Sequence, residues 1–396
     1  MHKDITVRRL VEIWLVATKL GLTSFGGPIA HLGYFHEEYV RKRKWLDEQS
    51  YAELVTLCQF LPGAASSKVG IGVGVFRGGL LGGLAAWLGF TAPSVAVLVL
   101  AALLIRGADV GGAGWVHGLH LAAVAIVAHA VWGMGRKLAP DAQRVTIALL
   151  TAVLLLLVES AWTQVALLAA AGVIGYALYR RKAIADSPEL PMPIGRLFAT
   201  VCLVLFFALL VGLPLLSRVA PGEWLAVFDA FYRTGSLVFG GGHVVLPLLE
   251  REVVPNGWVD SGSFLAGYGL TQAMPGPLFT FAAYLGAVTG GIPYALLATA
   301  AVFLPSILLL YGVLPFWGVL RRSPKVQGAL AGMNAAVVGL LLAALYDPLW
   351  TSGVRSPTDL ALALVLFLMV AFWRLPPWLA VVAGAAGGML LQAVAL

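Results

Sequence analysis

The feature that most constrains this chain is a series of apolar stretches, each long enough to cross a lipid bilayer as a helix. A transmembrane helix needs about 20 mostly apolar residues. Such stretches lie at 80–105, 117–137, 143–158, 162–179 and 195–217, and again at 293–314, 325–346, 357–373 and 376–396. Only 11% of the 396 residues are charged, against about 25% in soluble domains. The composition excludes a soluble globular enzyme and predicts an all-α polytopic protein surrounded by the lipid bilayer.

The charge balance and the cysteines point to no other class of protein. The 26 Lys and Arg residues exceed the 19 acidic residues to give a net charge of +7, which in a membrane protein mostly reports topology. We expect no nucleic-acid partner, because a basic soluble face with interleaved aromatics is missing. Cys58 and Cys202 are far apart and resemble buried hydrophobes, and His117, His120 and His129 lack metal-ligand spacing. We therefore expect no cofactor and no metal.

Several apolar segments are too short to cross a bilayer alone. Two longer segments, 10–25 and 223–240, are more polar but have helical periodicity. The short segments are interrupted by Gly-Gly-Pro, Pro-Gly or Pro-Gly-Pro, and they lie at 28–40, 50–61, 64–77, 242–254, 260–274 and 277–291. Interrupted segments at matching positions in two halves are typical of transporters that bind their substrate near the bilayer midplane.

The two halves of the chain match in register. Phe25-Gly26-Gly27-Pro28 corresponds to Phe239-Gly240-Gly241-Gly242, and the pair Pro93-Ser94 corresponds to Pro305-Ser306. Between these motifs, Trp45, Asp47, Ser50, Gln59, Pro62 and Gly63 recur as Trp258, Asp260, Ser263, Gln272, Pro275 and Gly276. A register that stays nearly constant over so many motifs indicates an internal duplication. We expect a first repeat at 1–182, a linker with one transmembrane helix at 183–222, and a second repeat at 223–396.

The basic loops indicate that the two repeats have opposite orientations. Arg41–Lys44 is a cytoplasmic loop by the positive-inside rule, whereas the matching segment 253–257 carries no base. The pattern is reversed at 321–325, which is basic, and its counterpart 107–116, which is not. The unmatched helix at 195–217 would invert everything after it. The sequence therefore predicts two inverted repeats with paired broken helices near the midplane and a cytoplasmic N-terminus.

The broken segments have the chemistry of an anion site. A helix that begins inside a bilayer leaves N–H groups unpaired and carries about half a positive charge at that end. In the first repeat this end is followed by two hydroxyls and a lysine. The predicted substrate-binding residues are Gly26, Gly27, Gln59, Pro62, Gly63, Ser66, Ser67 and Lys68 in the first repeat, and Gly240, Gly241, Gln272, Pro275, Gly276 and Thr280 in the second. Two alternatives stay open: the breaks are kinks satisfied by neighbouring helices, and Lys68 snorkels to an interface.

Other polar residues near the breaks are weaker candidates. His31 and His243 flank the glycine motifs, and Lys19 and Arg233 precede them. Glu38 and Glu252 are equivalent in the two repeats, as are Asp47 and Asp260. These carboxylates either carry protons or, as we expect, cap helices or pair with Arg41 and Arg251 at the surface.

The repeated motifs resemble the chromate transporter family in its long, two-domain form. The resemblance rests on the Phe-Gly-Gly-Pro start, the Trp-X-Asp loop, the Gln-X-X-Pro-Gly break and the following Pro-Ser, from about Thr18 to Leu345. It implies a bacterial inner-membrane protein that exports chromate, driven by membrane potential or proton motive force, and confers chromate resistance. The chain departs from the family at Ala64, where the second proline of Pro-Gly-Pro is missing, and at Lys68, where a glutamine is usual.

Three other functions compete with chromate export. A sulfate-like oxyanion carrier without chromate preference is the nearest of them. An integral-membrane enzyme would need a haem motif, HExxH, GxSxG or a cysteine pair, and the sequence has none of these. A scaffold subunit would not need paired breaks. A homodimer is compatible with the sequence.

Overall fold

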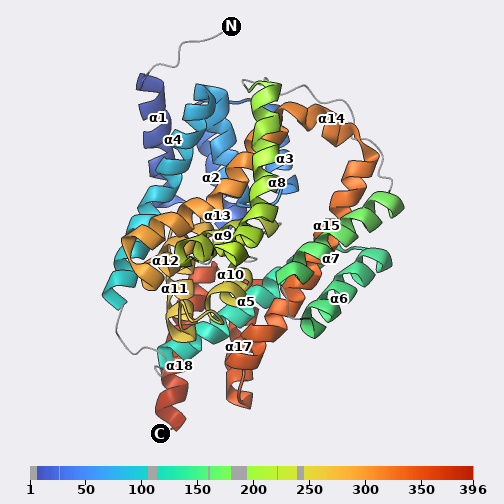
Figure 1. Cartoon of the computed structure of the whole chain (residues 1–396). Helices are drawn as coiled ribbons and strands as arrows, with labels where there is room; N and C mark the ends of the chain where they lie inside the picture. Colours follow the sequence, from blue (N-terminus) through green and yellow to red (C-terminus); the bar gives the residue numbers. More distant parts are fainter. Residues whose placement is uncertain are drawn as a thin grey trace. The chain divides into compact units, whose positions relative to one another are not determined.

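The computed structural model describes residues 7–25, 27–105, 114–158, 161–179, 194–220, 222–238 and 245–395, and the regular elements in these ranges are helices (Figure 1). The chain divides into two compact units. Unit 1 comprises Met1–Arg106, Asp186–Gly242 and Met274–Gly318. Unit 2 comprises Gly107–Ala185, His243–Ala273 and Val319–Leu396.

Each unit contains helices from both halves of the sequence. Unit 1 holds α1 (Val7–Thr23), α2 (Gly27–Phe35), η1 (His36–Lys42), α3 (Glu48–Phe60), α4 (Ala65–Ile105), α8 (Arg196–Val219), α9 (Glu223–Leu237), η2 (Leu278–Thr280), α12 (Phe281–Gly290), α13 (Ile292–Val313) and η3 (Leu314–Phe316). Unit 2 holds α5 (Gly114–Leu138), α6 (Ala142–Leu157), α7 (Ala161–Leu178), α10 (Val245–Val253), α11 (Ser261–Ala273), α15 (Pro324–Ala344), η4 (Leu345–Trp350), α16 (Thr351–Gly353), α17 (Pro357–Ala371) and α18 (Pro377–Ala395). The short α14 (Trp317–Arg322) runs from one unit into the other.

Helices lie at the stretches expected from hydropathy, but four of them are shorter apolar helices in the structure: Ala142–Leu157, Ala166–Leu178, Pro357–Ala371 and Pro377–Ala393. Within the described ranges, five helical stretches are long and apolar enough to cross a membrane: Ala65–Leu104, Gly114–Leu138, Arg196–Ser217, Ile292–Leu320 and Pro324–Asp347. On α8 the apolar side chains of Leu197, Val204 and Val219 are exposed. Leaving such a surface in water is unfavourable, whereas lipid solvates it. The chain is therefore an all-helical, multi-pass membrane protein.

Two helical hairpins begin at the sequence breaks. In α4 the helix folds back at Gly79 (φ 64°, ψ −158°), so that Gly74 contacts Gly82. Between α12 and α13 the chain folds back at Gly291 (φ 77°, ψ −159°), and Gly286 contacts Tyr294. Gly286, Gly291 and Tyr294 are the counterparts of Gly74, Gly79 and Gly82. The spacing within each of these pairs is the same as the spacing between the two Pro-Ser motifs. The short segments expected at 64–77 and 277–291 are therefore the first arms of two equivalent hairpins.

Within unit 1 each break is held by the opposite half of the sequence. The Gly63 amide donates to the Val238 carbonyl at the end of α9 (2.6 Å), and the Gly276 amide donates to the Ser24 carbonyl at the end of α1 (2.9 Å). Ser24 and Val238 are equivalent positions, since each directly precedes the Phe-Gly-Gly motif of its own half. Exchanging the two halves thus converts one contact into the other.

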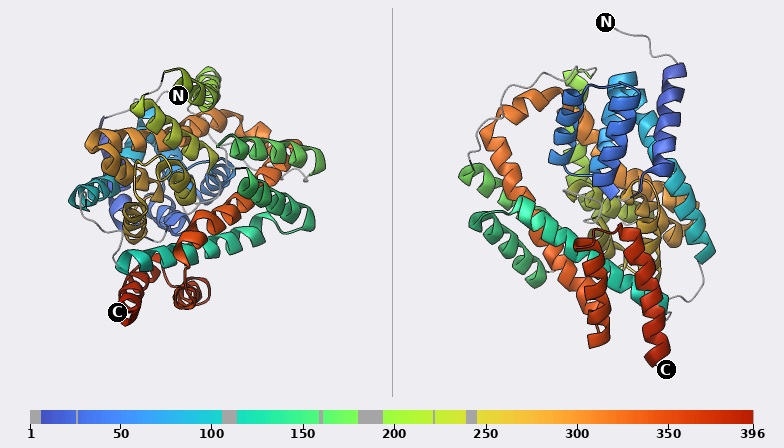
Figure 2. Two further views of the ribbon diagram at one scale, coloured as in Figure 1. Left: turned by 60° about the horizontal axis from the view of Figure 1, so that its bottom comes forward. Right: turned by 180° about the vertical axis from the view of Figure 1, so that it is seen from behind.

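The serines of the two Pro-Ser pairs make the same kind of reciprocal contact. Ser306 Oγ accepts a hydrogen bond from the Ala64 amide (2.9 Å). Ser94 Oγ donates one to the Pro275 carbonyl (2.8 Å). The helices alongside are packed alike: Gly21 of α1 lies against the Phe90 carbonyl of α4, and Gly235 of α9 against the Val302 carbonyl of α13. Figures 1 and 2 show α1 running beside α4 from two sides.

The compact units cut across the repeats expected from sequence. The first repeat contributes α1–α4 to unit 1 and α5–α7 to unit 2, and the second is divided in the same way apart from α10 and α11. In unit 2, α5 packs on α18 where Gly118 meets Gly384, and α7 packs on α15 where Gly175 meets Gly328. The repeat boundaries stay predictions.

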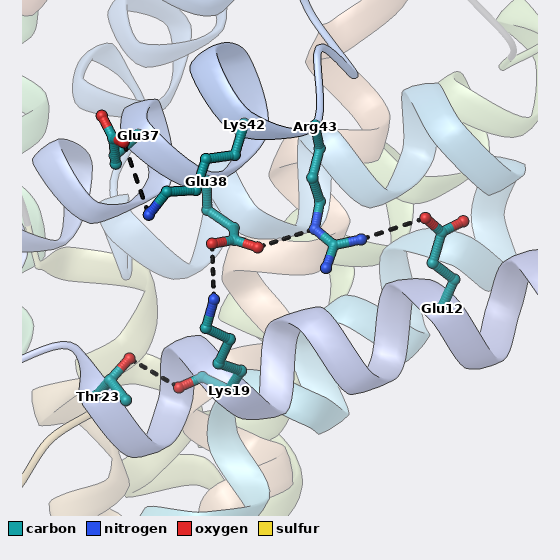
Figure 3. Close-up of polar contacts among 7 residues, drawn as sticks. All are labelled: Glu12, Lys19, Thr23, Glu37, Glu38, Lys42 and Arg43. Atoms are coloured by element: carbon teal, nitrogen blue, oxygen red, sulfur yellow. Dashed lines mark hydrogen bonds and ion pairs between the residues drawn. The ribbon is translucent and has the colours of Figure 1, made fainter.

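A network of charged side chains ties α1 to η1 (Figure 3). The Glu38 carboxylate, with only 6% of its side chain exposed, accepts from Lys19 Nζ (2.9 Å) and Arg43 Nε (2.8 Å). Arg43 also reaches Glu12 (3.3 Å) and lies over the Trp45 ring. Burial alone would raise the pKa of Glu38, but the hydrogen bonds from Arg43 and Lys19 outweigh it and hold this pKa below its usual value.

These contacts decide between the roles expected for the equivalent carboxylates of the two halves. Asp47 and Asp260 cap α3 and α11 by accepting from the Ser50 and Ser263 amides (2.8 and 2.9 Å). The expected capping is confirmed. The expected pairing of Glu38 with Arg41 is wrong, because η1 turns the Arg43 side chain onto this carboxylate instead.

Gly276→Ala is expected to destabilise the protein. Its backbone (φ 98°) lies in a region that side chains other than glycine rarely adopt, and the added methyl would collide with Ser94 Oγ. Strain of this kind costs about 1–3 kcal/mol. Thermal unfolding in detergent measures the effect. The control is Gly33→Ala, where a methyl meets open space; equal unfolding temperatures for the two variants would contradict the reciprocal contact.

Glu38→Gln is expected to lower stability at neutral pH by about 1–3 kcal/mol, since two charged donors lose their ionised acceptor. Because the folded-state pKa is depressed, this contribution is present above the unfolded pKa and is lost as the pH falls through the folded value. Unfolding temperatures at pH 7 and pH 4 therefore differ more in wild type than in the variant. Glu37→Gln, an exposed neighbour with longer ion pairs, serves as control.

Candidate anion site at the first break

The first break leaves the start of α4 without partners in its own helix. The Lys68 amide donates to the Ala64 carbonyl (2.9 Å), which makes Ala64 the residue before the first helical turn. The amides of the next three residues, Ala65, Ser66 and Ser67, therefore have no acceptor within α4. The side chains of Ser66 and Ser67 are buried. The first turn of α4 thus presents polar donors inside unit 1.

Lys68 brings a buried amino group to this turn. Its side chain is completely buried, and Nζ donates to the carbonyls of Leu61 (2.5 Å) and Pro62 (2.9 Å). These carbonyls follow the C-terminus of α3, the negative end of its dipole. Within the described residues the hydrogen bonds of Lys68 go to neutral carbonyls rather than to a carboxylate. Nζ therefore lies between the carbonyl end of α3 and the start of α4, where a bound anion would favour its charged form.

His31 connects the start of α4 with other buried polar groups. Its Nδ1 lies 3.2 Å from Ser66 Oγ, and its ring contacts Phe35 and Phe90. Four atoms of unit 1, on residues near the breaks or next to the Phe90 that His31 contacts, are buried and have no hydrogen-bond partner among the described residues: Ser24 Oγ, His31 Nε2, Ser67 Oγ and Thr91 Oγ1. Leaving a buried polar group unpaired costs about 1–3 kcal/mol. A polar ligand would remove that cost.

The second break has different chemistry. The Thr280 hydroxyl donates to the Pro277 carbonyl (2.6 Å) and is therefore occupied by its own turn. The residues in front of it, Leu278 and Phe279, are apolar and buried. From Leu278 to Gly290 the sequence contains no charged residue. The lysine and the unpartnered hydroxyl found at the first break thus have no counterpart among the described residues at the second.

Unit 1 contains most of the predicted site residues. These are Gly27, Gln59, Pro62, Gly63, Ser66, Ser67, Lys68, Pro275, Gly276 and Thr280. Gln59 lies on the exposed face of α3, away from the buried donors. Gln272 is buried but belongs to α11 of unit 2. Gly26, Gly240 and Gly241, together with the weaker candidate His243, lie outside the described residues.

Four polar residues of the site were not predicted. Ser24, Thr91, Ser94 and Ser306 are small residues within apolar segments, where they resemble helix-packing residues. The repetition of Pro-Ser was the available signal for Ser94 and Ser306, but it marked the duplication without indicating a partner. Arg233, one of the weaker site candidates near the breaks, pairs with Asp229 one turn away (3.1 Å).

Comparison with known proteins places the chain in a family. A protein family model described as chromate transporter matches residues 11–176 and 225–389. A probable chromate transport protein of Synechococcus elongatus is 28% identical over 399 residues, covering 98% of this chain and 96% of the relative. The chromate transport protein of Pseudomonas aeruginosa is 29% identical over 349 residues, covering 86% of this chain and 81% of the relative.

A half-length relative bears on the duplication. The uncharacterized transporter YwrA of Bacillus subtilis is 29% identical over 171 residues, which is 96% of its length but 42% of this chain. No solved structure matches the chain. The family model covers most of the chain in two segments of similar length, one in each half. On this evidence the chain belongs to the chromate transporter family, whose members are transporters rather than enzymes.

Proposed function

We propose that this protein is a secondary transporter that exports chromate across a bacterial inner membrane and so gives chromate resistance. The substrate site proposed is the first turn of α4. The observation that carries the proposal is the fully buried Lys68 amino group beside a helix N-terminus that also carries the unpartnered Ser67 hydroxyl. Family membership and the names of the relatives support chromate as the substrate.

An oxyanion at this position would be held by several kinds of donor. The amides of Ala65, Ser66 and Ser67 point along the helix axis, where the dipole places about half a positive charge. The Ser67 hydroxyl and His31 Nε2 supply further polar atoms without partners among the described residues. Lys68 adds the charge, and its hydrogen bonds to the two carbonyls after α3 keep it at the break. The positive φ of Gly63 allows the backbone to bend there.

The hairpins support an arrangement of inverted repeats around this site. The first arm of α4, 65–77, would extend about 20 Å, which is shorter than the hydrocarbon core of about 30 Å. An arm of that length that folds back at Gly79 would place its start inside the bilayer. The reciprocal hydrogen bonds of Gly63 and Gly276 are what a two-fold relation between the repeats would produce. Alternating access would come from rocking of one part of the transporter against the other.

The membrane potential favours export of a dianion. One charge crossing 100 mV is worth about 2.3 kcal/mol, so a dianion that leaves a negative-inside cell gains about 4.6 kcal/mol. Uptake would need roughly three or more cations to move with each dianion before it became favourable. Outward transport therefore needs no further energy source.

The second candidate function is transport of sulfate or a similar oxyanion without chromate preference. Amides, hydroxyls and one ammonium recognise a tetrahedral dianion by its charge and size, and sulfate shares both properties with chromate. Competition by sulfate against chromate flux measures the preference. Inhibition by equimolar sulfate would favour the second candidate.

Ser67→Ala is expected to weaken chromate binding at least tenfold, which corresponds to about 1.5 kcal/mol or more for a hydrogen bond to a charged ligand. Because Ser67 Oγ has no partner among the described residues, its removal leaves folding intact. Potential-driven chromate uptake into everted vesicles gives the half-saturating concentration. Thr299→Val is the control, since this hydroxyl bonds within its own helix (2.7 Å to the Ala295 carbonyl).

Lys68→Met is expected to reduce the same chromate uptake more than tenfold, because the site loses the amino group that a bound dianion would keep charged. This variant also removes the bonds to Leu61 and Pro62, so its unfolding temperature is measured alongside. A folded Lys68→Met protein with wild-type uptake, together with an unaffected Ser67→Ala variant, would place the substrate elsewhere. Absence of chromate flux in the wild type would overturn the substrate assignment itself.

A further inference from the structure

Glu250 of unit 2 is a buried carboxyl group without a compensating partner among the described residues. It lies on α10, which packs against η4 and α15. The residue is 4% exposed, and its Oε2 is buried without a hydrogen-bond partner in the described part of the chain. A carboxylate in such a place is expensive unless it is paired or protonated. The structure therefore favours the neutral form of this side chain.

The charged groups around Glu250 do not supply that pairing. Next to it on α10, Arg251 directs Nη2 to the Asp347 carbonyl of η4 (2.9 Å). The other acidic groups nearby are Glu252 on α10 and Asp347 on η4, and the one ionisable residue of α15 is Lys325, at the start of that helix and over the Tyr176 ring. Burial raises the pKa of Glu250 to about 7; Arg251 opposes this rise and Asp347 adds to it.

The other buried glutamate of the described chain provides a contrast. Glu38 is as deeply buried as Glu250, but its two oxygens accept from Lys19 and Arg43. Two cations keep Glu38 ionised, whereas the described structure gives Glu250 no such pair. The position equivalent to Glu250 in the first half is His36, which bonds the exposed Glu48 (2.6 Å). The first half therefore has no carboxyl group at the position equivalent to Glu250.

We propose that Glu250 is a proton-binding site whose protonation changes during transport, so that protons enter the cell as the oxyanion leaves. This rests on the proposed function, to which it adds the coupling ion. In the protonated state Arg251 holds the Asp347 carbonyl, at a point where the backbone departs from helical geometry (φ −128°, ψ 118°). Loss of the proton creates a carboxylate beside Arg251. The guanidinium is drawn to it, and the contact between α10 and η4 is weakened.

The first test measures proton movement in proteoliposomes of the full chain, with a chromate gradient and a pH-sensitive dye. In wild type a chromate gradient is expected to drive proton flux in the opposite direction. Glu250→Gln is expected to lose this proton flux at least tenfold while potential-driven chromate flux stays within about threefold of wild type. Glu252→Gln, one residue away, is the matched control and keeps both fluxes.

Several outcomes would overturn the inference. These are wild-type proton flux in Glu250→Gln, and chromate flux without proton flux in the wild type. Loss of both fluxes in Glu250→Gln together with a lowered unfolding temperature would also overturn it, because Glu250 would then act in folding. Absence of chromate flux in the wild type overturns the proposed function instead, and Glu250 is then judged by its titration alone.

The second test measures that titration through unfolding in detergent. Because its pKa is raised on folding from 4.5 to about 7, the folded protein binds more protons than the unfolded chain between these values. Stability contributed by the neutral group is present at low pH and is lost as the pH rises to about 7. The unfolding temperature of Glu250→Gln relative to wild type is therefore expected to increase from pH 5 to pH 8. A pH-independent difference would show that Glu250 holds no proton.

Discussion

The structure of unit 1 depends on satisfying backbone groups where helices are broken among apolar residues. Without water, an unpaired N–H or C=O is costly, and the breaks at Pro62-Gly63 and Pro275-Gly276 expose several of them. The protein meets this constraint reciprocally, because each glycine amide donates to a helix end from the opposite half. The serines of the Pro-Ser pairs complete the arrangement. In this chain, each break is therefore closed by a helix end from the opposite half.

The same backbone arrangement carries different chemistry in the two halves. At the first break the turn leads to Ser66, Ser67 and Lys68, and at the second to Leu278, Phe279 and Thr280, whose hydroxyl is already bonded. The buried glutamates differ as well, since among the described residues cations compensate Glu38 and not Glu250. The proposed anion site and the proposed proton site thus rest on side chains that differ between the two halves. The backbone contacts are shared by the two halves, whereas the polar side chains that the proposed transport uses differ between them.

Much of the fold could be predicted because its signals are local. Hydropathy and the positions of Gly and Pro located the short segments. Asp47 and Asp260 cap α3 and α11, the helices that directly follow these two aspartates. Predictions that required side-chain partners were less successful. Arg43 rather than Arg41 meets Glu38, because η1 is wound differently from an α-helix. Gln59 belongs to the repeated motif yet faces outward, since its position on α3 depends on how that helix packs against α4.

The sequence by itself determined the helical membrane class, the duplication with its nearly constant register, and the position of a basic, hydroxyl-rich break. These features follow from composition and motif spacing, which can be read along the chain without knowing which residues touch. The tertiary structure alone decided which groups meet. It assigned Lys68 to the carbonyls of Leu61 and Pro62, Ser306 to Ala64, and Ser94 to Pro275. It also divided the chain into two units that each combine both halves. Contacts between residues in opposite halves of the chain arise from packing of whole helices, and no local pattern encodes them.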